Sequence, residues 1–139
     1  MSSSRHEPIS SIRVERLVQV WSYSVSMKQL LLRATKSTDA PTRVDLLFTG
    51  VAAMNLPTMG IRDLDVQVAT STERSAILAD VPVAHLEERT CFVLTGVDNL
   101  SVAPFRGWIV AGAMSSCEDD GEYYEDSQLI PALTSEPPA

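Results

Sequence analysis

An alternation of apolar and polar side chains recurs along this chain and constrains its fold more than any other feature. It is clearest in residues 21–27, where large residues alternate with serines, and it returns in 43–48 and 64–68. Successive side chains point to opposite faces of a strand, whereas a helix repeats about every 3.6 residues. The pattern therefore predicts three strands, the first with Ser22, Ser24 and Ser26 on its wet face.

Further strands are expected where short apolar or β-branched runs lie between turn residues. The first strand should begin near Val14 and bend or bulge before Trp21, and others should cover 30–35 and 51–56. Segments 90–95 and 107–115 are apolar on both faces, which is typical of central strands covered on two sides. We expect these last two to be antiparallel neighbours.

A single helix is predicted near residues 71–79. Thr70 and Glu73 have the spacing of a capping box, and good helix formers follow until Val81-Pro82. The expected fold class is therefore mainly β (α+β minor), with this one short helix. We expect a single antiparallel β-rich domain, either a sandwich or an open barrel of about seven strands.

Length and composition bound the domain organisation. The chain has 139 residues, of which 45% are hydrophobic and 21% charged, as in an ordinary folded domain. The expected β-rich domain covers residues 10–130. Residues 1–9 and the proline-containing tail 131–139 have little to bury and are expected to be disordered.

Compartment follows from what the sequence lacks. No apolar signal region opens the chain, and no stretch approaches the roughly 20 apolar residues of a spanning helix. Cys91 and Cys117 should lie on the order of 16 Å apart, too far for a disulfide. We expect a cytoplasmic protein with two reduced thiols.

Net charge limits the classes of partner. The formal charge is −7, which opposes the phosphate neutralisation that nucleic-acid binding needs and anchoring on anionic lipid. We expect no nucleic-acid partner and no membrane, and a basic protein partner fits better. An exposed strand edge would also allow pairing with a second copy of the chain.

The strongest candidate for function is an acidic run, residues 118–126, which follows the last expected strand. Six of its nine residues are carboxylates, a third of the chain's acids, and two are tyrosines. Such crowding requires screening by water, a cation or a basic partner. Partner-binding residues are therefore expected to be Glu118, Asp119, Asp120, Glu122, Tyr123, Tyr124, Glu125 and Asp126.

Three interpretations of this run compete. A calcium loop of the EF-hand type fails, because Ser116 and Ser127 would occupy positions that require Asp and Glu. A solvated, partly disordered loop, another kind of cation site and a protein-binding surface remain. The two tyrosines favour the protein-binding surface, because tyrosine is enriched at interfaces.

No motif indicates catalysis. His6 and His85 lack the spacing of a zinc site, and Cys91 in an apolar run is a poor nucleophile to pair with His85. Asp63 and Asp65 could share a metal with Glu118, although a wet strand face explains them more simply. We assign no catalytic, cofactor-binding or metal-ligating residue, and no cofactor.

Two functions remain. The favoured one is a non-enzymatic acidic protein-interaction module, such as an immunity- or inhibitor-type protein that blocks a basic partner. The alternative is a small metal-binding protein or metal-assisted hydrolase that uses clustered carboxylates. The visible acids and aromatics favour the first, because a complete set of metal ligands is not apparent.

Overall fold

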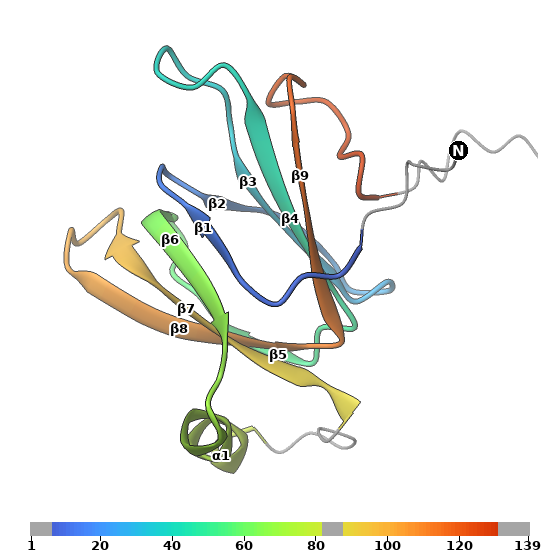
Figure 1. Cartoon of the computed structure of the whole chain (residues 1–139), viewed down its shortest axis with the longest axis vertical. Coiled ribbons are helices and arrows are strands. Elements are labelled where there is room, and N and C mark those ends of the chain that lie inside the picture. Colours follow the sequence, from blue (N-terminus) through green and yellow to red (C-terminus); the bar gives the residue numbers. More distant parts are fainter. Residues whose placement is uncertain (1–6, 82–87, 131–139) are drawn as a thin grey trace, which may run out of the picture.

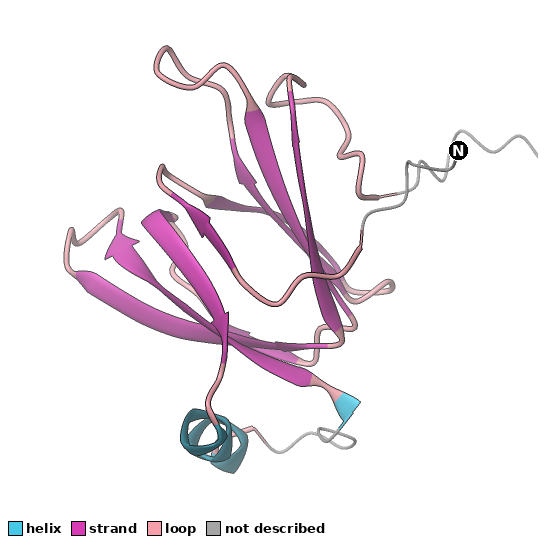
Figure 2. Ribbon diagram, in the orientation of Figure 1, coloured by secondary structure: helices cyan, strands magenta, loops and turns pink. Residues whose placement is uncertain are grey.

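A computed structural model of the chain describes residues 7–81 and 88–130. These residues form two antiparallel sheets and one short helix (Figure 1, Figure 2). The prediction of a single, mainly β domain is confirmed, and of the two predicted architectures the structure is consistent with a β-sandwich. The described residues form nine strands, whereas the sequence predicted about seven. Two of the predicted strands are each divided where the chain passes from one sheet to the other.

The larger sheet has five strands in the order β1-β6-β7-β8-β5. Every neighbouring pair in it is antiparallel. Its strands are β1 (Ile12–Val14), β5 (Ala53–Asn55), β6 (Ile61–Val68), β7 (Thr90–Asp98) and β8 (Pro104–Ala111). The expected antiparallel pairing of β7 with β8 is confirmed, with Cys91 opposite Val110.

The smaller sheet has four strands in the order β2-β3-β4-β9. Its strands are β2 (Gln19–Ser24), β3 (Gln29–Ala34), β4 (Arg43–Thr49) and β9 (Ala113–Asp119). The predicted strand 107–115 is wrong as a single element, because it is divided between the two sheets at Gly112. The backbone N–H of Gly112 donates to Thr49 O at 2.8 Å, which fixes the chain where it passes from β8 to β9.

The first predicted strand is divided in the same way. β1 belongs to the larger sheet and β2 to the smaller, and residues 15–18 connect them. The expected bulge is present as a register shift between Val20 and Ser22. Trp21 and Tyr23 do not form a buried face, since they are 36% and 39% exposed on a strand at the edge of its sheet.

The main core fills the space between the sheets. Its centre includes Phe48 of β4 and Phe92 of β7, whose rings meet edge to face with centroids 5.4 Å apart. Each fully buried apolar side chain of this kind stabilises the fold by roughly 1.5–3 kcal/mol. The inward residues of the predicted strands therefore hold the sandwich together.

Helix α1 (Ser71–Ala79) covers the outer face of the larger sheet. Ile77 and Val81 pack there against Cys91, Val93 and Val110. This second cluster explains why β7 and β8 are apolar on both faces, as predicted. Both cysteines are free, and they lie on different sheets. No helix among the described residues is long and apolar enough to cross a membrane.

The capping box predicted for α1 is present. The N–H of Glu73 donates to Thr70 Oγ1 at 3.1 Å, and the N–H of Thr70 donates to Glu73 Oε1 at 2.8 Å. This second bond is the main reason that the pKa of Glu73 is lowered. The helix therefore begins where local side-chain bonding satisfies its first free N–H groups.

Replacing Thr70 by alanine should lower the free energy of unfolding by about 1 kcal/mol, the usual cost of losing an N-cap. Urea unfolding followed by circular dichroism measures this change. Thr72→Ala is the matched control, since Thr72 lies in the same helix but does not cap it. Equal effects of the two substitutions would contradict the capping role.

Candidate interaction surface

The acidic run starts inside the smaller sheet. Strand β9 extends to Asp119, so Glu118 and Asp119 lie in a strand, and not in a loop as the sequence suggested. β9 pairs with β4 along its whole length, with Arg43 opposite Asp119. The strand continues because this pairing brings the carboxylate next to a cation. Residues 120–126 then cross the outer face of the same sheet.

Two arginines and one aspartate lie buried beneath that crossing. Arg33, Arg43 and Asp45 are only 1–2% exposed. Asp45 lies opposite Arg33 in the β3-β4 pairing, and both its carboxylate oxygens accept hydrogen bonds from that guanidinium, at 2.7 and 3.0 Å. Such bidentate pairing is among the strongest charge-assisted contacts in proteins.

Arg43 forms the second pair. Its Nε and Nη2 donate to the two carboxylate oxygens of Asp119, both at 2.9 Å, and its Nε also lies 3.9 Å from Asp45. The hydrogen bond between Arg43 and Asp119 is the main reason that the pKa of Asp119 is lowered. The same hydrogen bond is the main reason that the pKa of Arg43 is raised. Two cations therefore face two carboxylates, so the buried cluster is electrically balanced.

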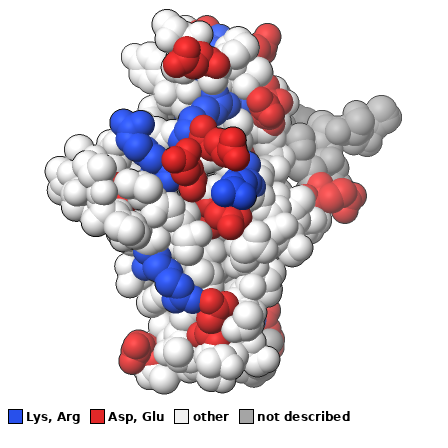
Figure 3. Space-filling model, turned by 60° about the vertical axis from the view of Figure 1, so that its left-hand side comes forward, with Lys and Arg blue, Asp and Glu red and all other residues white. Residues whose placement is uncertain are grey.

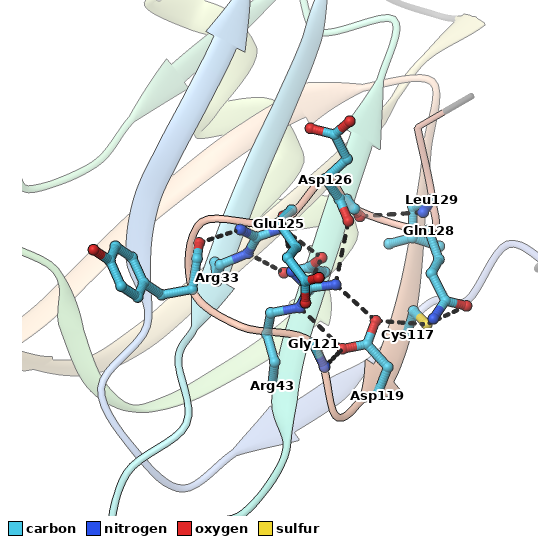
Figure 4. A network of polar contacts seen from close by, with 12 residues as sticks. Arg33, Arg43, Cys117, Asp119, Gly121, Glu125, Asp126, Gln128 and Leu129 are labelled. Atoms are coloured by element: carbon cyan, nitrogen blue, oxygen red, sulfur yellow. Dashed lines mark hydrogen bonds and ion pairs between the residues drawn. The ribbon is translucent and has the colours of Figure 1, made fainter. Parts of the chain in front are cut away.

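The same arginines hold the backbone of the acidic run (Figure 4). Arg33 Nη1 donates to Tyr123 O at 2.6 Å. Arg43 donates to three further carbonyl oxygens, those of Glu122 at 2.9 Å, Glu125 at 2.8 Å and Asp126 at 3.3 Å. Among the described residues no buried side-chain nitrogen or oxygen lacks a partner. The run is therefore an ordered segment fixed from below, and not a partly disordered loop.

The outward side chains of the run differ in how they are paired. Lys36 Nζ donates to a carboxylate oxygen of Glu122 at 2.8 Å, which is the main cause of the raised pKa of Lys36, and Thr42 donates to Glu118. Within residues 7–81 and 88–130, the carboxylates of Asp120 and Asp126 form no hydrogen bond or ion pair. Figure 4 shows the Asp126 carboxylate pointing away from the arginines. These two charges remain available to solvent or a partner.

Three aromatic rings, two of them from the acidic run, contact one another in this region. Trp21 and Tyr123 meet edge to face with centroids 6.4 Å apart, and Tyr123 meets Tyr124 in the same way at 5.2 Å. Trp21, Tyr123 and Tyr124 are 36%, 58% and 69% exposed as whole residues. The Arg33 guanidinium lies 5.2 Å from the centroid of the Trp21 ring. Trp21 was missed as a surface residue, because alternation alone placed it on a buried face.

The structure does not assemble the predicted metal alternative. No group of three or more His, Cys, Asp or Glu side chains among the described residues could hold a metal ion. A register shift separates Arg62 from Asp65 in β6, so Asp63 and Asp65 do not form a regular pair on one strand face. Glu118 lies in the other sheet, and His6 and His85 lie outside the described residues.

Cys91 also fits a structural role better than a catalytic one. It is 1% exposed, and burial raises the pKa of its thiol. A thiol that stays protonated is a weak nucleophile. The hypothetical pairing with His85 cannot be placed, because His85 lies outside the described residues.

Comparisons with models of protein families, with curated proteins and with solved structures find no match.

Asp119→Asn should lower the free energy of unfolding by about 3 kcal/mol at neutral pH, because the buried Arg43 loses its carboxylate partner. The folded-state pKa of Asp119 is depressed, so its stabilisation is complete above the unfolded pKa and is lost as pH falls through the folded value. The difference from wild type should therefore shrink below about pH 3.9. Urea unfolding at a series of pH values measures it.

The exposed Asp126 is the control residue for this comparison, since its carboxylate has no partner among residues 7–81 and 88–130. Asp126→Asn should change the free energy of unfolding by less than about 0.5 kcal/mol at any pH. A loss in Asp119→Asn that stayed constant from neutral to acid pH would show that the ion pair is not its cause.

Gly121 lies directly over Arg43, and a Cβ there would come within 2.5 Å of Arg43 Cζ and Nη2. Gly121→Ala should therefore push the guanidinium out of place and destabilise the fold by about 1–3 kcal/mol. It should also increase proteolytic cleavage within residues 120–126. Asp120→Ala changes the neighbouring exposed residue and should do neither, and identical behaviour of the two variants would argue against the close approach.

Proposed function

We propose that this chain is a non-enzymatic interaction module that binds a basic protein partner. The contact surface is the acidic aromatic patch, which comprises Trp21, Asp120, Glu122, Tyr123, Tyr124, Glu125 and Asp126. The observation that carries the proposal is a contiguous set of three exposed aromatic residues, two of them on a run in which the carboxylates of Asp120 and Asp126 have no partner within the described chain.

The chemistry of the patch suits a cationic partner. Aromatic side chains supply large contact areas at low entropic cost and can receive Lys or Arg over their faces. Tyr124 is the most exposed of the three rings and is the natural anchor. The carboxylates around it would steer a basic surface into place and fix its orientation.

The rigidity of the segment also supports binding. Four backbone carbonyls of the run accept hydrogen bonds from Arg33 and Arg43, so its conformation is largely set before a partner arrives. A preorganised surface spends less binding free energy on ordering. This is the arrangement expected of an immunity- or inhibitor-type protein, which must block its target tightly.

The charge contribution is tested with Asp120→Asn, Glu122→Gln and Asp126→Asn combined, which leaves the buried Asp119 in place. The wild-type chain serves as bait for affinity capture, and the captured protein is purified for stopped-flow kinetics at several salt concentrations. Association of this variant should be about tenfold slower and less dependent on salt, since steering acts mainly on the association rate. Tyr124→Ser should mainly accelerate dissociation.

The control removes the same kind of charge elsewhere. Asp80 and Glu88 are exposed and lie outside the patch, so Asp80→Asn with Glu88→Gln should leave both rates within about twofold of wild type. If the patch variant and this control bind equally well, the patch is not the contact surface. A captured partner with an acidic surface would likewise overturn the proposal.

A further inference from the structure

A cleft of about 480 Å³ lies outside the acidic aromatic patch and shares no residue with it. Its charged lining comes from three segments. Glu15 and Arg16 belong to the β1-β2 connection, Asp39 to the β3-β4 connection, and Arg62 and Asp63 to β6. Figure 3 shows basic and acidic side chains side by side on one face of the molecule. The cleft therefore presents both signs of charge within one hollow.

The charges in the cleft are held in place but are not neutralised by one another. Arg16 Nη1 donates to Thr42 O at 2.8 Å, and Arg62 Nε donates to Asn99 Oδ1 at 2.8 Å. Both acceptors are uncharged, and each guanidinium keeps further N–H donors. Within the described residues, Arg16, Arg62, Asp39 and Asp63 form no ion pair. A ligand could pair with them without first breaking a salt bridge.

The two cleft residues of β6, Arg62 and Asp63, lie at a bulge in the larger sheet. The register shift after Arg62 places Asp63 in the left-handed region, with φ of 54°. The facing residue is Gly96, where a Cβ would come within 2.4 Å of Ile61 Cγ2 and 2.6 Å of Arg62 O. Bulges of this kind re-aim side chains at the edge of a sheet. Glycine at 96 thus allows the bulge that brings Arg62 and Asp63 to the cleft.

We propose that this cleft binds a small zwitterion, namely an amino acid or short peptide with a free ammonium and a free carboxylate. Arg16 and Arg62 are the partners of the carboxylate, and Asp39 and Asp63 are the partners of the ammonium group. The volume falls within the roughly 300–1,000 Å³ of small-molecule sites. Three wall carboxylates disfavour a polyanion such as phosphate, and two guanidiniums disfavour a polyamine.

The test titrates the isotope-labelled full chain with alanylalanine and follows backbone amide resonances. Shifts that saturate at millimolar peptide should appear for Arg16, Asp39 and Asp63. N-acetyl-alanylalanine lacks the ammonium group, and alanylalanine amide lacks the carboxylate. The affinity of each blocked peptide should be at least about tenfold lower than that of alanylalanine, because each lacks one charge-assisted contact.

Substitutions then locate the site. Arg62→Gln and Asp63→Asn should each weaken alanylalanine binding about tenfold. Asparagine tolerates the left-handed backbone at position 63. Arg106→Gln is the control, because Arg106 lies in β8 of the same sheet and pairs with Glu73 of α1, but does not line the cleft.

The proposal fails if alanylalanine produces no saturating shifts, or if the two blocked peptides bind as well as alanylalanine itself. It also fails if both cleft variants keep wild-type affinity. Should a variant not fold, the blocked peptides still decide the matter on the wild-type chain. None of these outcomes depends on whether the acidic aromatic patch binds a basic protein.

Discussion

The structure of the acidic run depends on the two buried arginines of the smaller sheet. Removing a guanidinium from water costs several kcal/mol unless its donors and charge are satisfied. Arg33 and Arg43 meet that requirement through Asp45, Asp119 and four carbonyl oxygens, those of Glu122, Tyr123, Glu125 and Asp126. The acidic run is therefore the cover of a cationic sheet face, and this cover keeps water away from the arginines.

This dependence divides the run into parts with different tasks. Asp119 faces inward and compensates Arg43, so its charge is part of the fold. The carboxylates of Asp120 and Asp126 and the ring of Tyr124 face outward and form no hydrogen bond with the buried arginines among the described residues. The concentration of carboxylates in the sequence is thus only partly a surface signal. An interaction surface built on such a base is rigid, because moving it would expose the arginines.

Local patterns predicted the local features of this fold. The helix occupies the predicted residues because its capping box is set by neighbours three residues apart. The buried network could not be predicted in the same way, because it depends on strand register. Arg33 meets Asp45 through the pairing of β3 with β4, and Asp119 reaches Arg43 from β9, 76 residues further along the chain. The one local hint was the alternation Arg43, Asp45 on a single strand face. The division of the predicted strand 107–115 could not be predicted from local patterns either, because it depends on the presence of the second sheet.

The two proposed sites use charge in opposite ways. The acidic aromatic patch carries an excess of one sign, so its field extends from the surface and falls off over a Debye length of about 8 Å at physiological salt. The cleft holds both signs at close range, and their fields largely cancel beyond it. Salt should therefore weaken recognition at the patch more than in the cleft, where direct hydrogen bonds dominate. Both sites still rest on backbone that the sheets fix, at β9 in one case and at the β6 bulge in the other.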